Sequence, residues 1–185
     1  CLPSILGLPQ YDAESGELVD IGSMLDLFLN PIPNLISKQM SVAMVTGACF
    51  WLPRSLWDEL GGFPEWFGSL SEDLYLCCLA RIKGYPVVVL PGSGFDHWIG
   101  KNFGGGKIVN GSMRTTLRRR AMSERNKTFV MFLCYPAPYA YFLIPFHLII
   151  LIIEGIFISI MKRNIIFWKI IYLNCIKYIK IKSLC

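Results

Sequence analysis

The sequence predicts an α/β fold followed by an apolar, helical C-terminal segment. Apolar runs and turn residues between positions 41 and 91 follow the order strand, helix, loop, helix, strand, which is typical of α/β domains. The last third of the chain is nearly all Ile, Leu, Phe and Tyr, and 54% of the 185 residues are hydrophobic. The net charge is +5, with basic residues concentrated from Arg114 onward, so we expect an anionic partner, either membrane lipid or a phosphorylated ligand.

The N-terminal region reads as loops that lead into a strand and a short helix. Residues 1–34 are loop-like, with "YDAESGELVD" forming a turn between two short extended pieces. The β-forming run "SVAMVTGACFWLP" predicts a buried strand over residues 41–53. A short helix follows in "PRSLWDELGG", with Pro53 in its first turn and Gly61-Gly62 ending it.

A second helix and a second strand come next. Ser71 is the expected N-cap, with Glu72 and Asp73 in the first turn of the helix and Gly84 at its end. The apolar face of this helix is expected to comprise Leu74, Cys77, Cys78 and Ile82. The following "YPVVVLP" predicts a short buried strand.

The apolar C-terminal segment is long enough to cross a membrane. Residues 129–161 contain one charged side chain, Glu154, and one histidine, His147. A bilayer takes about 20 apolar residues as a helix, and Pro136, Pro138 and Pro145 favour an irregular first part with the best span at 139–161. A re-entrant hairpin and a core helix of a globular protein remain alternatives.

Charged residues around this segment refine the prediction. Glu154 is costly in a span unless it lies near an interface or faces a partner. Basic residues flank the segment on both sides, at 114–127 and 162–163, so the positive-inside rule does not set its orientation. Lysines recur among apolar residues in 165–182, which predicts an interfacial helix.

The seven cysteines have no metal-finger spacing. Cys77-Cys78 are adjacent on a predicted helix, which suits apolar filling better than a ligand pair. We therefore expect a reduced, cytosol-facing protein. The sequence begins at Cys1, and we expect that it lacks its own beginning.

Carboxylates and a histidine stand at the two ends of one helix–strand unit. Glu72-Asp73 begin the helix, and Asp96-His97 follow the strand. By spacing alone, the carboxylates favour the positive end of the helix dipole, worth about 0.3–1 kcal/mol each. A carboxylate at a helix start also suits a general base, and two adjacent carboxylates repel, which raises one pKa. A histidine after a strand is either an ordinary hydrogen-bonding residue or a ligand.

Four segments between residues 44 and 136 follow one another in a recognisable order: "TGACFWLPRSLWDELGGFPEWF", "SEDLYLCCLARIKGYPVVVLP", "DHW" and "ERNKTFVMFLCYP". Their characteristic residues are Gly47, Gly61, Gly62, Phe63, Glu72, Asp73, Gly84, Tyr85, Pro91 and His97. This ordered combination resembles family 2 glycosyltransferases of the GT-A fold, closest to the rhamnosyltransferase-like branch that builds surface polysaccharides.

Two features depart from the family pattern. Pro64 replaces the aspartate expected after Gly-Gly-Phe, so the role of that carboxylate is lost or passes to Glu65. No Asp-x-Asp occurs in the chain, although such a motif holds the metal and the nucleotide diphosphate in the family. The resemblance therefore implies the C-terminal, acceptor-side half of an enzyme, which is inactive by itself because the donor-binding half is absent.

The resemblance implies a role for several of these residues. Asp73 would be the base of an inverting transfer from a nucleotide-diphospho-sugar, and Glu72 its neighbour touching the acceptor sugar. His97 would reach a divalent metal, Mn²⁺ or Mg²⁺, or the diphosphate, with Asp96 behind it.

Three further features extend the expected site. "GKNFGGGK" fails the P-loop spacing, and Lys101 and Lys107 suggest either a basic lid over the diphosphate or a flexible solvent loop. Trp66 and Trp98 stack on sugar rings or pack in the core, and Glu65 lies beside Trp66.

These inferences give a three-part organisation. Residues 1–127 form a partial GT-A domain, 128–163 a membrane-spanning or re-entrant segment, and 164–185 a basic interfacial tail.

The expected function is sugar transfer to a lipid-linked or polysaccharide acceptor, at a membrane and on its cytoplasmic face. The alternative is a non-catalytic, membrane-anchored sugar-binding or scaffold module. An integral subunit of a transport complex would leave the Glu-Asp and Gly-Gly-Phe pattern unexplained. No nucleic-acid partner is expected, because no recognition helix or single-strand module appears.

Overall fold

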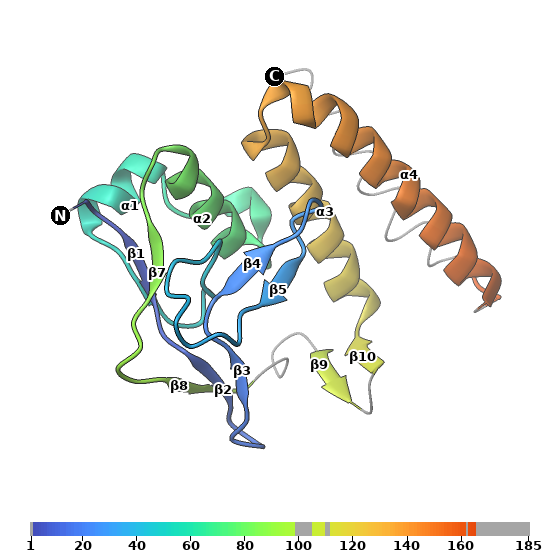
Figure 1. Cartoon of the computed structure of the whole chain (residues 1–185). Coiled ribbons are helices and arrows are strands. Elements are labelled where there is room, and N and C mark those ends of the chain that lie inside the picture. Colours follow the sequence, from blue (N-terminus) through green and yellow to red (C-terminus); the bar gives the residue numbers. More distant parts are fainter. Residues whose placement is uncertain (1, 99–104, 110–111, 162, 166–185) are drawn as a thin grey trace. The chain divides into compact units, whose positions relative to one another are not determined.

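A computed structural model describes the chain in two compact units, Cys1–Ile99 and Gly100–Cys185 (Figure 1). The residues described are 2–98, 105–109, 112–161 and 163–165.

Short strands and two helices make up the described part of the first unit. In chain order they are β1 (Ile5–Gly7), β2 (Gln10–Asp12), β3 (Leu18–Asp20), β4 (Ser23–Leu25), β5 (Pro31–Pro33), β6 (Phe50–Trp51), α1 (Arg54–Leu60), the 3-10 helix η1 (Glu65–Phe67), α2 (Glu72–Ile82), β7 (Val87–Val89) and β8 (Phe95–His97). The strand, helix, loop, helix, strand order is confirmed by β6, α1, η1, α2 and β7.

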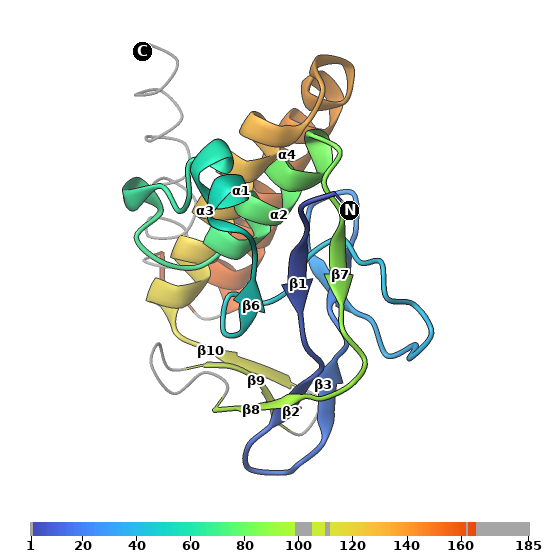
Figure 2. The same cartoon turned by 90° about the vertical axis from the view of Figure 1, so that its left-hand side faces the viewer.

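Two parallel strand pairs organise this unit (Figure 2). β1 lies between β6 and β7, antiparallel to β6 and parallel to β7, with Ile5 opposite Val87 and Gly7 opposite Val89. The chain then continues from β1 into β2 and from β7 into β8, and these strands also pair in parallel. The same two stretches of chain therefore run side by side through two successive sheets.

Apolar side chains bury one face of the strand β7. Val87 and Val89 are fully buried, as are Ile5, Leu56 and Leu76. The predicted buried strand "YPVVVLP" is thus confirmed over its central valines. Burying an aliphatic side chain contributes roughly 1.5–3 kcal/mol, so this small core stabilises the pairing of β1 with β7.

Both helices of the first unit begin and end near the predicted residues. α1 follows Pro53 and ends at Gly61, whose φ of 79° is left-handed. α2 has Glu72 and Asp73 in its first turn, and Gly84 is left-handed just beyond its end. Ser71 stands at the N-cap, but its side chain makes no capping bond, because its backbone is left-handed (φ 65°) and not extended.

Three expectations for this unit are wrong. Within residues 41–53 only Phe50 and Trp51 form a strand, and the earlier part makes isolated bridges through Ser41 and Met44, although Val42–Val45 is buried as expected. The loop-like reading of residues 1–34 is wrong, because they contain β1 to β5. β1 and β2 pair with distant strands, whereas β2–β3 and β4–β5 are local antiparallel pairs. The predicted turn between two short extended pieces is confirmed by the β2–β3 pair. Ile82 is 59% exposed and does not belong to the apolar face.

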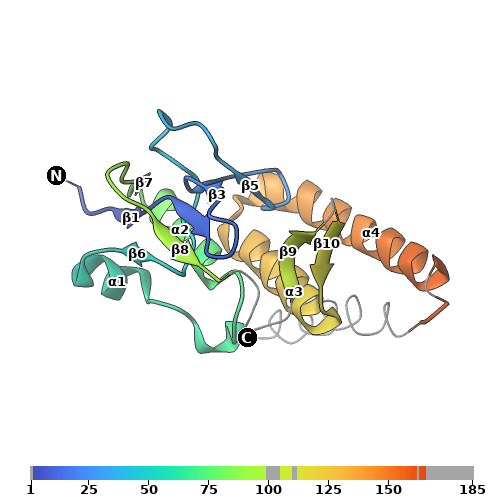
Figure 3. The same cartoon turned by 90° about the horizontal axis from the view of Figure 1, so that it is seen from below.

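The described part of the second unit contains a hairpin and two long helices (Figure 3). The hairpin strands are β9 (Gly105–Val109) and β10 (Ser112–Thr115), and the helices are α3 (Leu117–Cys134) and α4 (Ala137–Met161). The predicted irregular start of the apolar segment is wrong: the helical structure breaks only around Tyr135-Pro136, and Pro145 lies inside α4. Residues 166–182 of the predicted interfacial helix lie outside the described residues.

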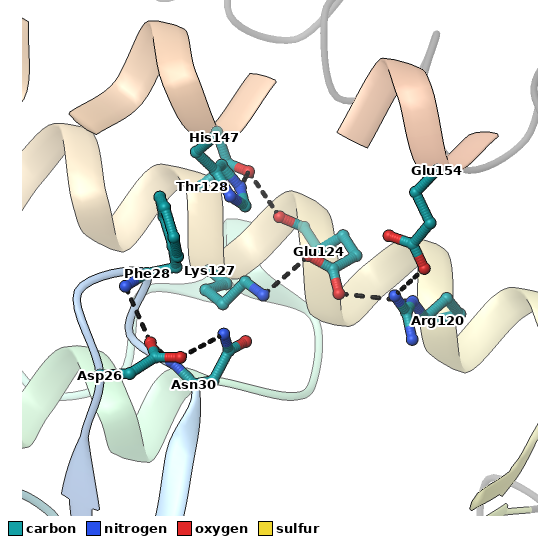
Figure 4. Close-up of polar contacts among 9 residues, drawn as sticks. All are labelled: Asp26, Phe28, Asn30, Arg120, Glu124, Lys127, Thr128, His147 and Glu154. Carbon is teal, nitrogen blue, oxygen red and sulfur yellow. Dashed lines mark hydrogen bonds and ion pairs between the residues drawn. The ribbon is translucent and has the colours of Figure 1, made fainter. Parts of the chain in front are cut away.

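A set of polar contacts connects α3 with α4 (Figure 4). The Arg120 guanidinium pairs with the Glu154 carboxylate at 2.6 Å and also lies 3.4 Å from Glu124. Lys127 pairs with Glu124 at 2.8 Å. Glu154 therefore has the cationic neighbour that a carboxylate in an apolar helix requires.

Within the described part of the chain, α4 is the one helix long and apolar enough to cross a membrane. Large apolar side chains remain exposed along it, among them Phe142 at 78% and Ile160 at 69%. Exposure on this scale indicates a surface that meets lipid or another apolar partner.

We predict that Gly22→Ala destabilises the full chain by about 1–3 kcal/mol, because overpacking displaces well-packed neighbours. A Cβ at Gly22 would lie 2.8 Å from methyl carbons of Val42 and Val89. Gly16→Ala is the matched control, since Gly16 has nearly the same φ (70° against 71°) but nothing within 4 Å of its Cβ. Urea unfolding of both variants in detergent micelles, followed by tryptophan fluorescence, measures the difference. Equal losses would mean that backbone strain, and not packing, sets the cost at Gly22.

Candidate functional site

The parallel pair β1–β7 places the candidate site at its carboxyl end. Gly7, the last residue of β1, lies opposite Val89 on one side and Phe50 on the other. A Cβ on Gly7 would lie 2.6 Å from Val45 Cγ1, so glycine there allows the segment before Gly47 to approach β1 closely. Ligands of open α/β sheets bind outside the carboxyl ends of parallel strands, which makes this edge the place to look for chemistry.

Asp73 is held at this edge by two backbone amides. The N–H of Gly47 donates to its Oδ2 at 2.8 Å, and the N–H of Leu74 donates to its Oδ1 at 2.8 Å. A Cβ on Gly47 would lie 3.3 Å from Asp73 Cβ, tighter than an ordinary contact. The turn and the first turn of α2 therefore fix the Asp73 carboxylate in one orientation.

The surroundings of Asp73 are apolar on the core side. Ile5, Val45, Phe50, Leu76 and Cys77 border the carboxylate around a gap too small for a water molecule. Burial raises the pKa of the Asp73 carboxyl group, and the hydrogen bonds from Gly47 and Leu74 lower it in part. The result is a rigid carboxylate that is a stronger base than an exposed aspartate.

Glu72 is a second perturbed carboxylate beside Asp73. Within the described part of the chain, its buried Oε2 has no hydrogen-bond partner. Burial is the main cause that raises the Glu72 pKa, and the negative charge of Asp73 raises it further. An unsatisfied carboxylate oxygen destabilises the fold, so a ligand hydroxyl that donates to it would be favoured.

His97 lies at the end of the second parallel pair and contacts Gln10. In the β2–β8 register, Gln10 lies opposite Phe95 and Asp12 opposite His97. The Gln10 Nε2 amide, on a buried residue, lies 3.1 Å from His97 Nδ1. Because an amide nitrogen only donates, Nδ1 accepts and the ring proton of neutral His97 lies on Nε2.

This tautomer bears on the expected metal site. A metal binds the imidazole nitrogen that carries no proton, and in this tautomer Nε2 carries the proton. Binding of a metal through Nε2 therefore requires the proton to move to Nδ1. The Gln10 amide would then have to turn so that its oxygen accepts from Nδ1–H. Among the described residues, no three His, Cys, Asp or Glu side chains come close enough to hold a metal ion. This part of the chain does not by itself fit a divalent metal, and the expected Mn²⁺ or Mg²⁺ remains a prediction.

The remaining expected site residues are dispersed over loops and strand ends. Trp66 belongs to η1, is 39% exposed and stacks on Phe67 with centroids 4.4 Å apart; Glu65 precedes it and is exposed. Trp98, 52% exposed, follows β8. Lys101 lies outside the described residues, and the backbone of Lys107 pairs with Arg114 in the β9–β10 hairpin. The second half of the glycine-rich stretch thus forms a strand.

Gln10 is the site residue that the sequence does not reveal. It stands in a segment that reads as loop, and no motif marks it. Only the parallel register of β2 with β8, set by residues almost ninety positions apart, brings it to His97.

We predict that Glu72→Gln raises the free energy of unfolding near neutral pH by a few tenths of a kcal/mol, because the side chain is half-exposed and its charge is screened. The raised pKa means that ionised Glu72 costs stability as the pH rises from the unfolded value of 4.5 through the folded pKa. The gain of the variant should therefore vanish well below 4.5. Unfolding titrations across this range measure it, with Glu65→Gln at an exposed carboxylate as control. Parallel pH profiles for wild type and Glu72→Gln would contradict the assignment.

We also predict that neutral His97 carries its proton on Nε2, and that Gln10→Glu shifts the proton to Nδ1. A carboxylate accepts where the amide donated, so the preferred tautomer reverses. Nitrogen-15 chemical shifts of the two histidines report the tautomer, with His147→Asn used for assignment. If Gln10→Glu leaves the His97 shifts unchanged, the Gln10 contact does not control the ring.

Comparison with known proteins identifies the family of this chain. No curated protein matches the chain. The family model described as "Glycosyl transferase family group 2" matches residues 25–179, a range that includes Asp73, His97 and both long helices. The mixed α/β structure with small sheets is consistent with such a domain. The chain therefore belongs to the family 2 glycosyltransferases.

Proposed function

We propose that the chain is the acceptor-side part of an inverting GT-A glycosyltransferase, with Asp73 as the general base. The observation that carries this proposal is the Asp73 carboxylate, held by the Gly47 and Leu74 amides at the carboxyl end of β1 and β7. A nucleotide-diphospho-sugar is the donor class that family membership suggests.

The proposed reaction moves one proton and one sugar. The acceptor hydroxyl oxygen forms a bond to the anomeric carbon of the donor, while the bond from that carbon to the diphosphate oxygen breaks with its electron pair. Asp73 accepts the hydroxyl proton, and the released nucleoside diphosphate carries the negative charge. Positioned proton transfer of this kind contributes about 10²–10⁴ in rate.

Other residues of the unit would bind substrates. Glu72 presents an unsatisfied oxygen to an acceptor hydroxyl, and Trp66 and Trp98 offer partly exposed indoles for sugar stacking, with Glu65 beside Trp66. Lys101 and Lys107 would attract the diphosphate. His97 would contact the diphosphate or supply one metal ligand.

The organisation that we propose keeps the division expected from the sequence. Residues 1–127 form the partial catalytic domain of the rhamnosyltransferase-like branch, 128–163 attach it to a membrane, and 164–185 form a basic interfacial tail. The catalytic part faces the cytoplasm, where a lipid-linked or polysaccharide acceptor is reached. The Asp-x-Asp motif and the donor-binding half come from outside these 185 residues, so the chain alone does not turn over.

We predict that Asp73→Asn, in an enzyme that joins this chain to its donor-binding half, lowers kcat by about 10²-fold or more. Asparagine cannot accept the proton of the acceptor hydroxyl. Its NH₂ group also replaces one of the two Asp73 oxygens that accept hydrogen bonds from backbone amides. Release of nucleoside diphosphate measures the rate, and circular dichroism confirms folding. Asp58→Asn, at an exposed carboxylate on α1, is the matched control.

The pH profile provides a second readout for the same base. Because burial raises the Asp73 pKa above 3.8, protonation removes the base as the pH falls through that raised value. The wild-type rate should fall in acid, and the residual rate of Asp73→Asn should lack this limb. An unchanged rate in Asp73→Asn would assign the base elsewhere.

A further inference from the structure

The parallel pair β2–β8 brings four side chains to one face of its sheet. β2 lies between β3 and β8 in this sheet (Figure 2). Gln10 lies opposite Phe95 and Asp12 opposite His97, and residues two apart in a strand point to the same side. These four residues therefore share one face, on which Gln10 and Asp12 are buried and Phe95 and His97 are half-buried.

Two contacts hold the His97 ring on this face. The Gln10 amide Nε2 lies 3.1 Å from His97 Nδ1, and the Phe95 ring lies beside the imidazole, with centroids 6.2 Å apart and planes tilted by 32°. Gln10 is itself fixed, because it is buried and its backbone pairs with both β3 and β8. On the other edge of the ring, Nε2 has no hydrogen-bond partner within the described part of the chain. Nε2 is therefore the edge that can meet a ligand.

The group beside Nδ1 distinguishes a hydrogen-bond donor from a metal ligand. A histidine that binds a metal almost always donates its second ring N–H to a carboxylate, a backbone carbonyl or a water. The neighbour of His97 Nδ1 is an amide nitrogen, which only donates, so Nδ1 accepts and Nε2 keeps the proton. The carboxylate opposite in register, Asp12, is turned to the backbone, since its Oδ1 accepts from the amides of Glu14 and Ser15. His97 is thus arranged to donate through Nε2.

We propose that Gln10 is a positioning residue that keeps His97 in the Nε2–H form, so that His97 donates a hydrogen bond to an anionic oxygen of the nucleoside diphosphate and does not ligate a metal. This inference rests on the proposed function for the identity of the ligand. A hydrogen bond to an ionised phosphate oxygen is roughly twice as strong as one between neutral groups. Directed at the diphosphate, it would stabilise the negative charge that develops on the leaving oxygen, while His97 keeps its proton.

Nitrogen-15 spectra of the full chain with labelled histidine, in detergent micelles, test the donor role. The probe is millimolar inorganic pyrophosphate with a chelator present, and His147, on α4, is the internal reference because the chain has two histidines. Pyrophosphate should move the His97 Nε2–H signals without loss of that proton, and the His147 signals should stay in place. A response that requires Mg²⁺ and removes the Nε2 proton would identify a metal ligand and overturn the proposal. No response of His97 under either condition would also overturn it.

The positioning role of Gln10 has its own test. Gln10→Glu replaces the donor by an acceptor, which favours the proton on Nδ1 and leaves Nε2 without one. The affinity for pyrophosphate should then fall about tenfold, the effect of losing one hydrogen bond to a charged group. Gln39→Glu adds the same charge at the other glutamine of the chain and is the matched control. Equal losses in both variants would mean that added charge, and not the position of the His97 proton, weakens binding.

Substitutions of His97 itself separate the two roles if Gln10→Glu does not fold. Glutamine places an amide NH₂ donor near the position of Nε2 but offers no imidazole nitrogen to a metal, and alanine offers neither. His97→Ala should lose about tenfold in pyrophosphate affinity, and His97→Gln should lose less. Equal losses in these two variants would contradict the donor role. None of these measurements depends on glycosyl transfer, so a failure here is distinguishable from a failure of the proposed function.

Discussion

The parallel pairing of β1 with β7 is the constraint on which the first unit depends. These strands are separated by about eighty residues, and their union closes a loop that contains both α1 and α2. Closing such a loop costs conformational entropy that local structure does not offset, so the fully buried Ile5, Val87 and Val89 must supply the stabilisation. Once they pair, the chain continues in register into β2 and β8, and the position of His97 is set together with that of Asp73.

The candidate site lowers the stability of the first unit at the carboxyl end of β1 and β7. Asp73 and Glu72 are adjacent carboxylates whose pKa values are raised by burial, and Glu72 leaves a buried oxygen unsatisfied among the described residues. A chain selected for stability alone would replace such groups with neutral residues. Ligands of open α/β sheets bind at the carboxyl end of parallel strands, so the position of these two carboxylates supports the role that we propose for them.

In the second unit, charge placement limits how an apolar helix can be used. Hydrophobicity alone makes α4 a candidate span, yet Glu154 and the cationic residues of α3 form one network with it. Paired charges tolerate a low dielectric better than single ones, but they resist transfer into hydrocarbon as a group. The charged side chains of α3 therefore raise the free energy of placing α4 in hydrocarbon.

Local patterns in the sequence determined much of this protein. The spacing of apolar residues and the positions of Pro53, Gly61 and Gly84 predicted α1, α2 and β7, because helix ends and buried strands follow from short-range sterics and burial. The Glu72-Asp73 pair could likewise be singled out from its place at a helix start. Pairing between distant segments was decided only by the tertiary structure: the parallel pairs β1–β7 and β2–β8, the Gln10–His97 contact and the Arg120–Glu154 ion pair. Each joins residues far apart in the chain, and no local periodicity specifies which distant backbone or side chain will complete the hydrogen bonds.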